Sequence, residues 1–483
     1  MHRQVEQHAA ERPEASAVRV FTAGRWVDTD WLRLRDMAAG VSEHARRTYR
    51  AGARVALALD NSAESLAVFL GLTSASVDVL CLEADPARAE VRRAAARRVG
   101  ARDSIGPVGG DGVLAYADVL ETAEGPLEAP DRNPELLGMT SGSTGEPRIV
   151  RQNLANIERG GCVYRDTYGY TAHDSLLGPI PMAHSFAMMG LFAGALMSGA
   201  RIVTMPRFSV SAVHTAFDEG ATVLLGTPMI YRILGMASLP AERASSLRAL
   251  LSSGGPLPTD TRAQAERVFG LPVRQIYGST EAGVIACQYD REEPWQDGCA
   301  GRIHPSATWE LRPAGVADAP AGAGWLHVRT ATLFAGYLGG DDALDENGLY
   351  DTGDLVSVGP GGDLTVLARK SSFINVGGRK VEPGRVSAVL DACAAVAEAH
   401  VFGHEKDGEE SVHAAVVLRD PCAASVADVL AFCRERLAAY EVPHRVHVLS
   451  ALPRTSLGKA DLTAIKQACA LPAVAGTGGG SVR

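Results

Sequence analysis

Short apolar runs alternate with segments of helical spacing through the first two thirds of the chain. Five runs rich in Val, Leu and Ala each end in a turn, at residues 54–60, 77–85, 201–206, 221–228 and 247–256. Between such runs, the segments SAESLAVFLGL, MGLFAGALMSG and DTRAQAERVFG place apolar residues on one face of a helix. This alternation predicts a large N-terminal α/β domain in which helices cover parallel sheets.

The pattern changes twice towards the C-terminus. Between about 296 and 368, short strands punctuated by Gly predict a small antiparallel unit that resembles a β-barrel. Beyond about residue 370, strands and helices follow one another in an order typical of an α+β fold. We therefore predict an N-terminal domain over 1–368, a smaller, mobile α+β domain over 369–470 and a flexible Gly-rich tail over 471–483.

Length and charge narrow the classes of protein that fit the chain. Its 483 residues exceed what one core usually holds. A net charge of −9 argues against a nucleic acid or an anionic membrane as the partner. The N-terminal residues are polar, so no signal peptide is visible, and the apolar runs are shorter than a membrane span. The eight cysteines contain no CxxC pair, which is typical of reduced thiols, so we expect a cytoplasmic protein. We expect it to be a monomer or a homodimer.

Lysine is scarce and unevenly placed. Only five of the 47 basic residues are Lys, at positions 370, 380, 406, 459 and 466. A genome biased towards Arg codons would explain the scarcity. The alternative is that at least one of these positions needs a compact ammonium group, which a planar guanidinium cannot replace.

The stretch MTSGSTGEPRIV, residues 139–150, differs from everything near it. Its small and hydroxylated residues surround Gly142 and Gly145, and glycine lets a backbone approach an anion closely. Such clusters are usually surface turns, and the alternative is a loop that holds phosphate groups. The stretch lacks the GxxxxGK[ST] pattern of the common phosphate loop, so the other motifs must decide.

Four further clusters carry residues suited to a nucleotide. QIYGSTEAG offers an aromatic ring that can stack on a flat base and a carboxylate, Glu281, that can hold Mg²⁺. In LYDTGDL, Asp354 can accept hydrogen bonds from ribose hydroxyls. The other two clusters are ARKSSFINVGGRKVEP and PRTSLGKAD, a turn that presents Lys459. Each is typical of an ordinary turn when it occurs alone.

The order of these five motifs resembles the acyl-adenylate-forming superfamily, which includes acyl- and aryl-CoA ligases, peptide-synthetase adenylation domains and luciferases. TSGSTGEPR is similar to the family's phosphate loop, YGSTEAG to its adenine and Mg²⁺ motif, YDTGDL to its ribose motif and PRTSLGKAD to its lysine loop. The resemblance covers nearly the whole chain. It implies that a carboxylate attacks the α-phosphate of ATP, and that CoA then displaces AMP, with ATP, Mg²⁺ and CoA as cofactors.

The resemblance also implies a role for each motif. Lys459 would reach the α-phosphate and the carboxylate as charge moves between them, Glu281 and Thr144 would hold Mg²⁺, and His184 would gate the carboxylate. With these, it implies the following nucleotide-binding residues: Thr140, Ser141, Gly142, Ser143, Thr144, Gly145, Arg148, Gly254, Gly255, Pro256, Tyr277, Gly278, Ser279, Thr280, Asp354, Arg369 and Lys459.

Among these, Tyr277 would stack on adenine, with the segment 254–256 on the other side of the base. Asp354 and Arg369 would bind ribose. The chain departs from the family at the phosphate loop, where Arg148 stands in place of Lys, and at the hinge, where Ser371 replaces Asp or Lys. A small residue can still absorb the change in φ and ψ at a hinge.

The acid site is implied by the motif PMAHSFAMMG, which contains His184. Domains that activate amino acids usually carry Asp after the Phe of this motif, whereas here Ala187 follows Phe186. The implied lining consists of His184, Phe186, Ala193, Ser253, Gly278, Val284 and Ile285. Because this lining is almost wholly apolar, we predict a small carboxylic acid with an uncharged tail, aromatic or conjugated by preference.

Three alternatives stay open from the sequence. The acyl group could pass to a carrier protein or to an amine instead of CoA, since Asn375 and Ala368 depart from the family where the second half-reaction is served. The substrate could be an unusual acid, such as an inorganic oxyacid. The chain could also be a non-catalytic, nucleotide-binding regulator, although binding alone does not require Lys459.

Overall fold

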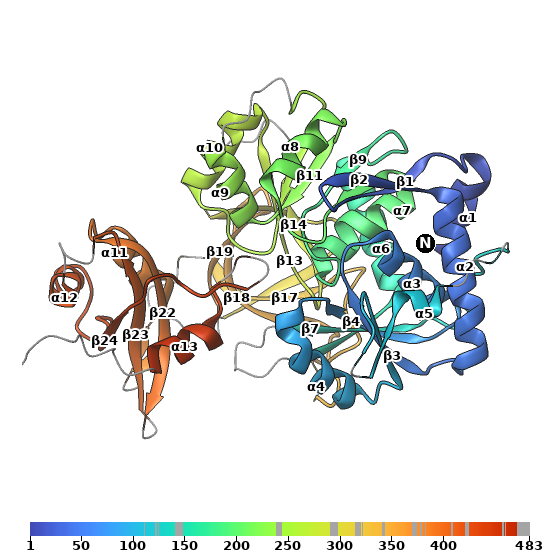
Figure 1. Ribbon diagram of the computed structural model, residues 1–483. Coiled ribbons are helices and arrows are strands. Elements are labelled where there is room, and N and C mark those ends of the chain that lie inside the picture. The colour runs from blue at the N-terminus through green and yellow to red at the C-terminus, as the bar shows by residue number, and fades with distance from the viewer. Residues whose placement is uncertain are drawn as a thin grey trace, which may run out of the picture. The chain divides into compact units, whose positions relative to one another are not determined.

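The computed structural model divides the chain into two compact units, with the division after Leu367 (Figure 1). The residues that it describes are 1–110, 112–120, 123, 125–140, 148–237, 244–289, 298–313, 320, 322–340, 343–369, 374–376, 379–381, 383–406, 409–420, 425–455, 458 and 460–470. Among these residues, no helix is long and apolar enough to cross a membrane.

One sheet of the first unit has six strands in the order β6-β5-β3-β4-β7-β8. Their bounds are β3 Arg54–Leu59, β4 Asp78–Glu83, β5 Asp103–Gly106, β6 Val113–Ala115, β7 Glu135–Thr140 and β8 Arg148–Asn153. All neighbours are parallel except β7 and β8, which form an antiparallel pair. The β7–β8 register sets Thr140 opposite Arg148, so the two ends of the predicted phosphate loop lie side by side.

Apolar residues fill both faces of this sheet. On β3, Val55 and Leu57 pack into the main core, which also contains the buried helix α3, Ala63–Ser74. Ala56 between them faces the other way and packs against Ala95 and Val99 of α4, Ala89–Val99. Because successive strand residues point to opposite faces, a strand covered on both sides reads as a continuous apolar run in the sequence.

The second sheet has thirteen strands in the order β16-β17-β18-β19-β15-β14-β13-β12-β11-β9-β10-β1-β2. Their bounds are β1 Ser16–Thr22, β2 Arg25–Asp30, β9 Ser175–Leu177, β10 Arg201–Thr204, β11 Val223–Gly226, β12 Ala249–Ser252, β13 Val273–Ser279, β14 Gly283–Cys287, β15 Cys299–Ile303, β16 Thr308–Pro313, β17 Ala323–Arg329, β18 Tyr350–Val358 and β19 Asp363–Arg369. The run from β13 to β1 is parallel, whereas β13 pairs with β14 in antiparallel fashion and begins the antiparallel end.

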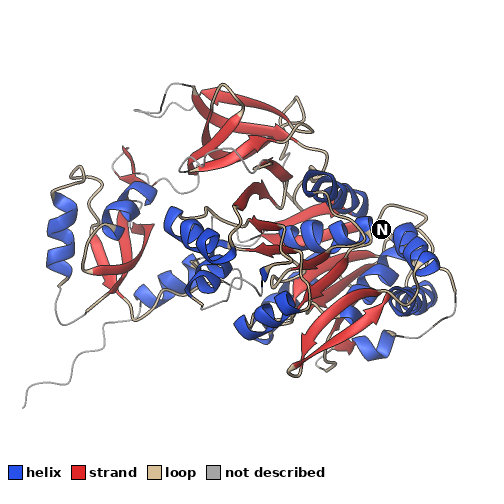
Figure 2. Cartoon of the chain, turned by 90° about the horizontal axis from the view of Figure 1, so that it is seen from above, coloured by secondary structure: helices blue, strands red, loops and turns tan. Residues whose placement is uncertain are grey.

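Helices pack against the strands of the first unit (Figure 2). Their bounds are α1 His2–Glu11, α2 Trp31–Thr48, α3 Ala63–Ser74, η1 Pro86–Arg88, α4 Ala89–Val99, α5 Tyr116–Val119, α6 Leu154–Tyr168, the π-helix η2 Ala187–Ala193, α7 Gly194–Ser198, α8 Val210–Asp218, α9 Pro228–Met236 and α10 Thr259–Phe269. Capping side chains fix several starts; Ser62, for example, accepts a hydrogen bond from the backbone of Ser65 at the start of α3.

The second unit is an α+β fold around a three-stranded sheet in the order β22-β23-β24. Its elements are β20 Ile374–Val376, β21 Arg379–Val381, α11 Pro383–Asp391, β22 Val396–Lys406, β23 Glu409–Leu418, α12 Val426–Arg434, β24 Arg445–Val448 and α13 Leu462–Ala470. Helices α11 and α12 pack on the face that carries Val412 and Val416, and α13 packs on the face that carries Phe402 and Ala415.

The predicted fold class is confirmed, with two differences in detail. The antiparallel strands between 299 and 369 do not form a separate sheet, because β14 joins them to the edge of the parallel strands. The strand β22 was not predicted, since HVFGHEK lacks a clear alternation of apolar and polar residues. The proposed boundaries of independently folding domains stay a prediction, and the tail over 471–483 lies outside the described residues.

Candidate active site

The ends of the phosphate loop are held by the β7–β8 pair. The Thr140 hydroxyl donates to the carbonyl oxygen of Arg148 at 3.5 Å. The Arg148 guanidinium lies over the ring of Tyr337, with its carbon 4.8 Å from the ring centroid. The residues between them, 141–147, lie outside the described residues, as do Ser371 and Lys459. Their roles stay predictions.

Glu281 lies between β13 and β14, where the chain turns back. Its side chain is buried, with 9% exposure, and its Oε1 accepts a hydrogen bond of 2.8 Å from the Tyr337 hydroxyl. Burial raises the pKa of Tyr337 to about 12, so the phenol stays neutral and can donate at physiological pH. Tyr337 was not predicted from the sequence, although an aromatic residue between glycines, in FAGYLGG, is a signal that could have found it.

A buried amide supports the backbone of the same turn. The Gln152 side chain donates to the carbonyl oxygens of Thr280 and Thr332, at 3.0 and 3.1 Å, and contacts that of Glu281 at 3.4 Å. Asn156 on α6 donates to the Gln152 side-chain oxygen at 2.9 Å and so fixes the orientation of the amide. Nothing in the sequence indicated a role for Gln152, because the backbone carbonyls to which it donates lie more than a hundred residues away.

The residues implied for adenine and ribose meet across the sheet. The Tyr277 hydroxyl at the end of β13 donates to Asp354 Oδ2 on β18 at 2.6 Å. Asp354 is buried, and its backbone N–H donates to the Thr352 hydroxyl at 3.1 Å. Arg369 is the last residue of β19, which neighbours β18 in the sheet. The structure therefore brings Tyr277 and Asp354 into direct contact.

The segment at 254–256 follows the carboxyl end of β12. Gly254 adopts φ +92°, a region that favours glycine, while an added Cβ would meet no atom closer than 3.7 Å. Ser253 just before it donates to the carbonyl oxygen of Ile276 at 3.0 Å and ties the end of β12 to β13. Ligands of open α/β sheets bind outside the carboxyl ends of parallel strands, which is where this turn and Tyr277 lie.

His184, the histidine predicted to gate the acid, lies beside a residue that reaches the turn at Thr280. Its Nε2 contacts the carboxylate of Glu83 at the end of β4. The next residue, Ser185, places its hydroxyl 3.5 Å from that of Thr280. Asn61 shapes the preceding segment, since its side chain accepts from the backbone of Met182 at 2.6 Å. Neither Glu83 nor Asn61 was singled out from the sequence.

Two residues of the predicted acid-site lining face opposite sides of β14. Val284 packs towards the main core, whereas Ile285 packs into a second cluster on the other face of the strand, as neighbouring strand residues do. A Cβ at Gly278 would lie 2.1 Å from the carbonyl oxygen of Gly283, so this position has no room for a side chain. The roles of these residues in the acid site stay predictions.

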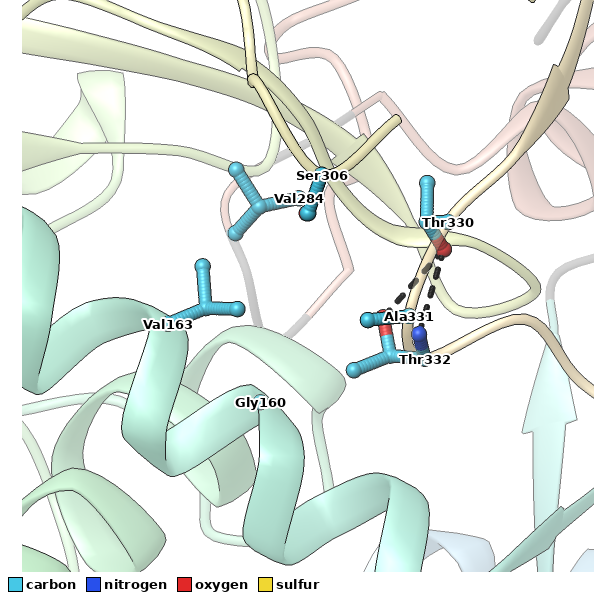
Figure 3. A pocket seen from close by; sticks show the side chains of 7 residues that line it. All are labelled: Gly160, Val163, Val284, Ser306, Thr330, Ala331 and Thr332. Atoms are coloured by element: carbon cyan, nitrogen blue, oxygen red, sulfur yellow. Dashed lines mark hydrogen bonds between the residues drawn. The ribbon is translucent and has the colours of Figure 1, made fainter. Parts of the chain in front are cut away.

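Phe186 and Ala193, two further predicted lining residues, pack against α6. Phe186 packs against Tyr164, with ring centroids 6.2 Å apart. Ala193 of η2 packs so closely on α6 that a Cβ at Gly161 would lie 2.7 Å from its backbone. Val284 borders a small cavity that is lined by Gly160, Val163, Val284, Ser306, Thr330, Ala331 and Thr332 (Figure 3). None of these seven lining residues carries a charge.

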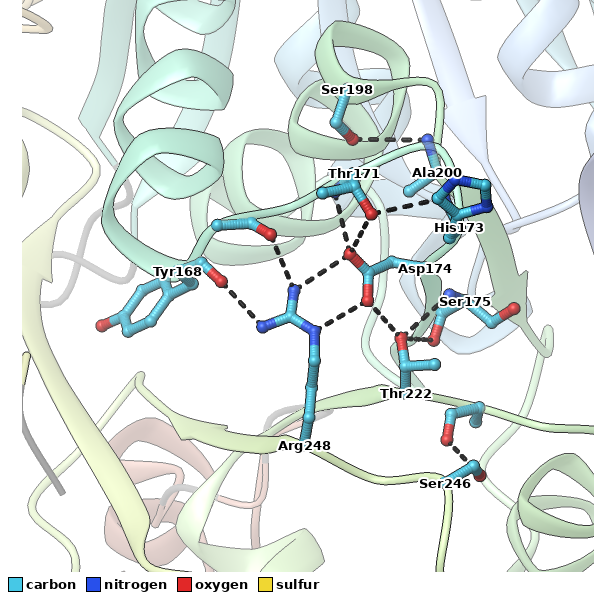
Figure 4. Close-up of polar contacts among 12 residues, drawn as sticks. Tyr168, Thr171, His173, Asp174, Ser175, Ser198, Ala200, Thr222, Ser246 and Arg248 are labelled. Carbon is cyan, nitrogen blue, oxygen red and sulfur yellow. Dashed lines mark hydrogen bonds and ion pairs between the residues drawn. The ribbon is translucent and has the colours of Figure 1, made fainter.

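A polar network closes the opposite end of the parallel strands (Figure 4). Arg248, before β12, pairs with Asp174, before β9, at 2.8 Å, and also donates to the carbonyl oxygen of Tyr168 at 2.9 Å. Burial raises the pKa of Asp174, but hydrogen bonds from Arg248 and Thr222 outweigh it and lower the pKa to about 2. This network lies at the amino ends of the strands, so we interpret it as structural.

The donor groups suit a magnesium nucleotide. Mg²⁺ in nucleotide sites is usually bound by one or two carboxylates together with substrate phosphates, and Glu281 offers one such carboxylate. Within the described ranges, no group of three or more His, Cys, Asp or Glu side chains could hold a metal ion by itself.

Comparison with known families gives two matches. Residues 5–338 match the family described as AMP-binding enzyme, and residues 385–459 match the AMP-binding enzyme C-terminal domain. The first match includes the phosphate-loop stretch, Tyr277, Glu281 and Tyr337, and the second ends at Lys459.

Similar proteins of known activity include CoA ligases. The chain is 32% identical to a 2-succinylbenzoate–CoA ligase of Bacillus cereus over 331 residues, which are 66% of this chain and 67% of that protein. It is 30% identical to an oxalate–CoA ligase of Arabidopsis thaliana over 367 residues, which are 73% of this chain and 71% of that protein.

Among solved structures, the fold is similar to that of o-succinylbenzoate coenzyme A synthetase from Bacillus subtilis in complex with ATP and magnesium ion. The TM-score is 0.81 at 26% sequence identity, and the match covers 96% of this chain and 99% of that one.

Proposed function

The chain belongs to the family of AMP-binding enzymes, and from that premise we propose that it activates a carboxylic acid with an uncharged tail. It is an acid–CoA ligase of the AMP-forming type, which forms an acyl-adenylate from ATP and then a CoA thioester. The proposal concerns the identity of the acid and the residues that act on it.

The first half-reaction needs positioning and charge neutralisation more than covalent chemistry. A carboxylate oxygen of the acid attacks the α-phosphorus, the bond to the bridging oxygen breaks, and pyrophosphate leaves. In the proposed mechanism, Arg148 and the loop over 140–145 hold the departing pyrophosphate, and Lys459 faces the α-phosphate and the carboxylate. His184 orients the acid.

Base and ribose are held on the other side of the phosphates. Tyr277 presents its ring to adenine, and the 2.6 Å hydrogen bond to Asp354 supports this role because it fixes the ring. Asp354 and Arg369 are assigned to the ribose hydroxyls. Mg²⁺, when bound with ATP, supplies positive charge to the β- and γ-phosphates. Glu281 and Thr144 would hold it.

In the second half-reaction the CoA thiolate attacks the acyl carbonyl carbon, and AMP leaves with the bonding electron pair. The α+β domain over 369–470 is proposed to turn about Ser371 between the two steps, so that Lys459 serves only the first. The CoA acceptor follows from the enzyme class.

The uncharged side chains predicted to line the acid site, among them Phe186 and Ala193, are the observation that carries the substrate class. Phe186 packs against Tyr164 and adds aromatic surface without charge. An unpaired charge in such surroundings costs several kcal/mol, which would exclude it by orders of magnitude. The preference for an aromatic or conjugated acid stays a prediction.

A substrate panel tests the proposal. Pyrophosphate release is measured with acetate, hexanoate, benzoate, cinnamate, oxalate, 2-succinylbenzoate and phenylalanine, with and without CoA. We expect an acid with an uncharged tail to give the highest kcat/KM, and thioester to appear only with CoA. A clear preference for a dicarboxylate or an amino acid would overturn the proposed acid.

A further inference from the structure

Tyr337 connects two groups that the proposed function places around the phosphates. Its segment runs beside β8, since Tyr337 pairs with Val150 through a backbone bridge and Leu338 donates to the carbonyl oxygen of Ile149 at 2.9 Å. The start of β8 is Arg148, at the end of the phosphate loop. Backbone pairing therefore fixes where the Tyr337 side chain begins.

The side chain reaches both groups at once. Its hydroxyl donates to Glu281 Oε1 at 2.8 Å, and its ring lies under the Arg148 guanidinium, 4.8 Å from the centroid. Phe334 packs edge-on against the ring at 5.0 Å, and the Tyr350 hydroxyl lies 3.4 Å from the Tyr337 hydroxyl. These contacts restrict rotation of the ring.

We propose that Tyr337 is a positioning residue for the magnesium nucleotide, which orients the Glu281 carboxylate through its hydroxyl and Arg148 through its ring. The proposal rests on the proposed function, where Glu281 is assigned to Mg²⁺ and Arg148 to the phosphates. A carboxylate with one oxygen held by a phenol cannot turn without breaking that bond. Removal of a partner that orients a metal ligand typically weakens metal binding about 10- to 100-fold.

The two halves of the proposal separate by mutation. Tyr337→Phe removes only the hydroxyl and keeps the ring under Arg148, whereas Tyr337→Leu removes both. Tyr231→Phe is the control, because the Tyr231 hydroxyl lies 3.0 Å from each of two backbone carbonyl oxygens, on β11 and β12, to which its one proton can donate. The variant loses a hydroxyl that is more deeply buried than that of Tyr337, and it does not touch Glu281.

Metal binding is measured directly, with Mn²⁺ as an electron-paramagnetic probe and a non-hydrolysable ATP analogue present at saturation. We expect Tyr337→Phe to raise the Mn²⁺ dissociation constant about 10- to 100-fold and Tyr231→Phe to leave it unchanged. Unchanged Mn²⁺ binding in Tyr337→Phe would overturn the role of the hydroxyl. A merely structural loss would instead appear equally in both variants.

Two further measurements make the test independent of folding and of the proposed function. In a Glu281→Gln background, adding Tyr337→Phe should not weaken Mn²⁺ binding further, and additive losses would contradict the coupling. Without metal, Tyr337→Leu should bind the analogue more weakly than Tyr337→Phe, and equal affinities would overturn the role of the ring. If the wild-type protein releases no pyrophosphate with any acid, the proposed function fails, whereas the binding results judge Tyr337 alone.

Discussion

A cluster of histidines makes the second unit sensitive to acid. His413 on β23 places Nδ1 3.1 Å from Nε2 of His447 on β24. His404 on β22 stacks on the His413 ring at 4.6 Å, and His444 lies 6.2 Å away. Burial, followed by the nearby charges of His404, His447, His444 and Arg445, lowers the pKa of His413 to about 4. The folded protein therefore resists protonation at this position.

The direction and size of the effect follow from linkage. An ordinary histidine with a pKa near 6.5 takes up its proton in the unfolded chain well before His413 does in the folded one. The contribution of neutral His413 to the free energy of unfolding is fully present above about pH 6.5 and declines as the pH falls towards 4. Between about pH 7.5 and pH 5 the loss is about 2 kcal/mol, and the full shift corresponds to about 3 kcal/mol.

Hydrogen exchange followed peptide by peptide is the suitable assay, since all five tryptophans lie before residue 326 and fluorescence would miss the second unit. We expect the opening free energy of β23 to fall by about 2 kcal/mol between about pH 7.5 and pH 5, after correction for intrinsic exchange. His413→Asn, which cannot be protonated, should remove most of this fall, and the exposed His173→Asn should not. An equal fall in wild type and His413→Asn would refute the reasoning.

Three other predictions concern the first unit and the lysine loop. Asp174→Asn should lower the free energy of unfolding, measured in urea at neutral pH, by about 2 kcal/mol. Because the pKa of Asp174 is lowered in the folded protein, its carboxylate stabilises the fold above about pH 4, and this stabilisation declines towards pH 2. An unchanged urea midpoint would contradict the prediction. Gly278→Ala should cost about 1 to 3 kcal/mol and weaken ATP binding, while Gly125→Ala, with open space around it, should do neither. Lys459→Ala should abolish acyl-AMP formation but spare thioester formation from added acyl-AMP, and equal losses in coupled assays would refute its role.

Much of the fold and of the nucleotide chemistry could be predicted from local sequence. Strands such as β3 and β4 are covered on both faces, so their continuous apolar runs identify them without neighbours. Motifs for a phosphate loop, a base and a ribose are short and contiguous, and their order identified the family. The strand β22 was missed because its partners, not its own pattern, make it a strand.

Tertiary structure alone decided how the groups of the site are held. Gln152 supports a turn that lies 128 residues further along the chain, and Tyr337 holds a carboxylate 56 residues before it. Val284 and Ile285 are neighbours in sequence but face different clusters, since strand alternation separates them once β14 has formed. The sequence shows which chemical groups are available. Which of them come into contact depends on strand register and on the face of the sheet to which each side chain points, and both are set by pairing partners far away in the chain.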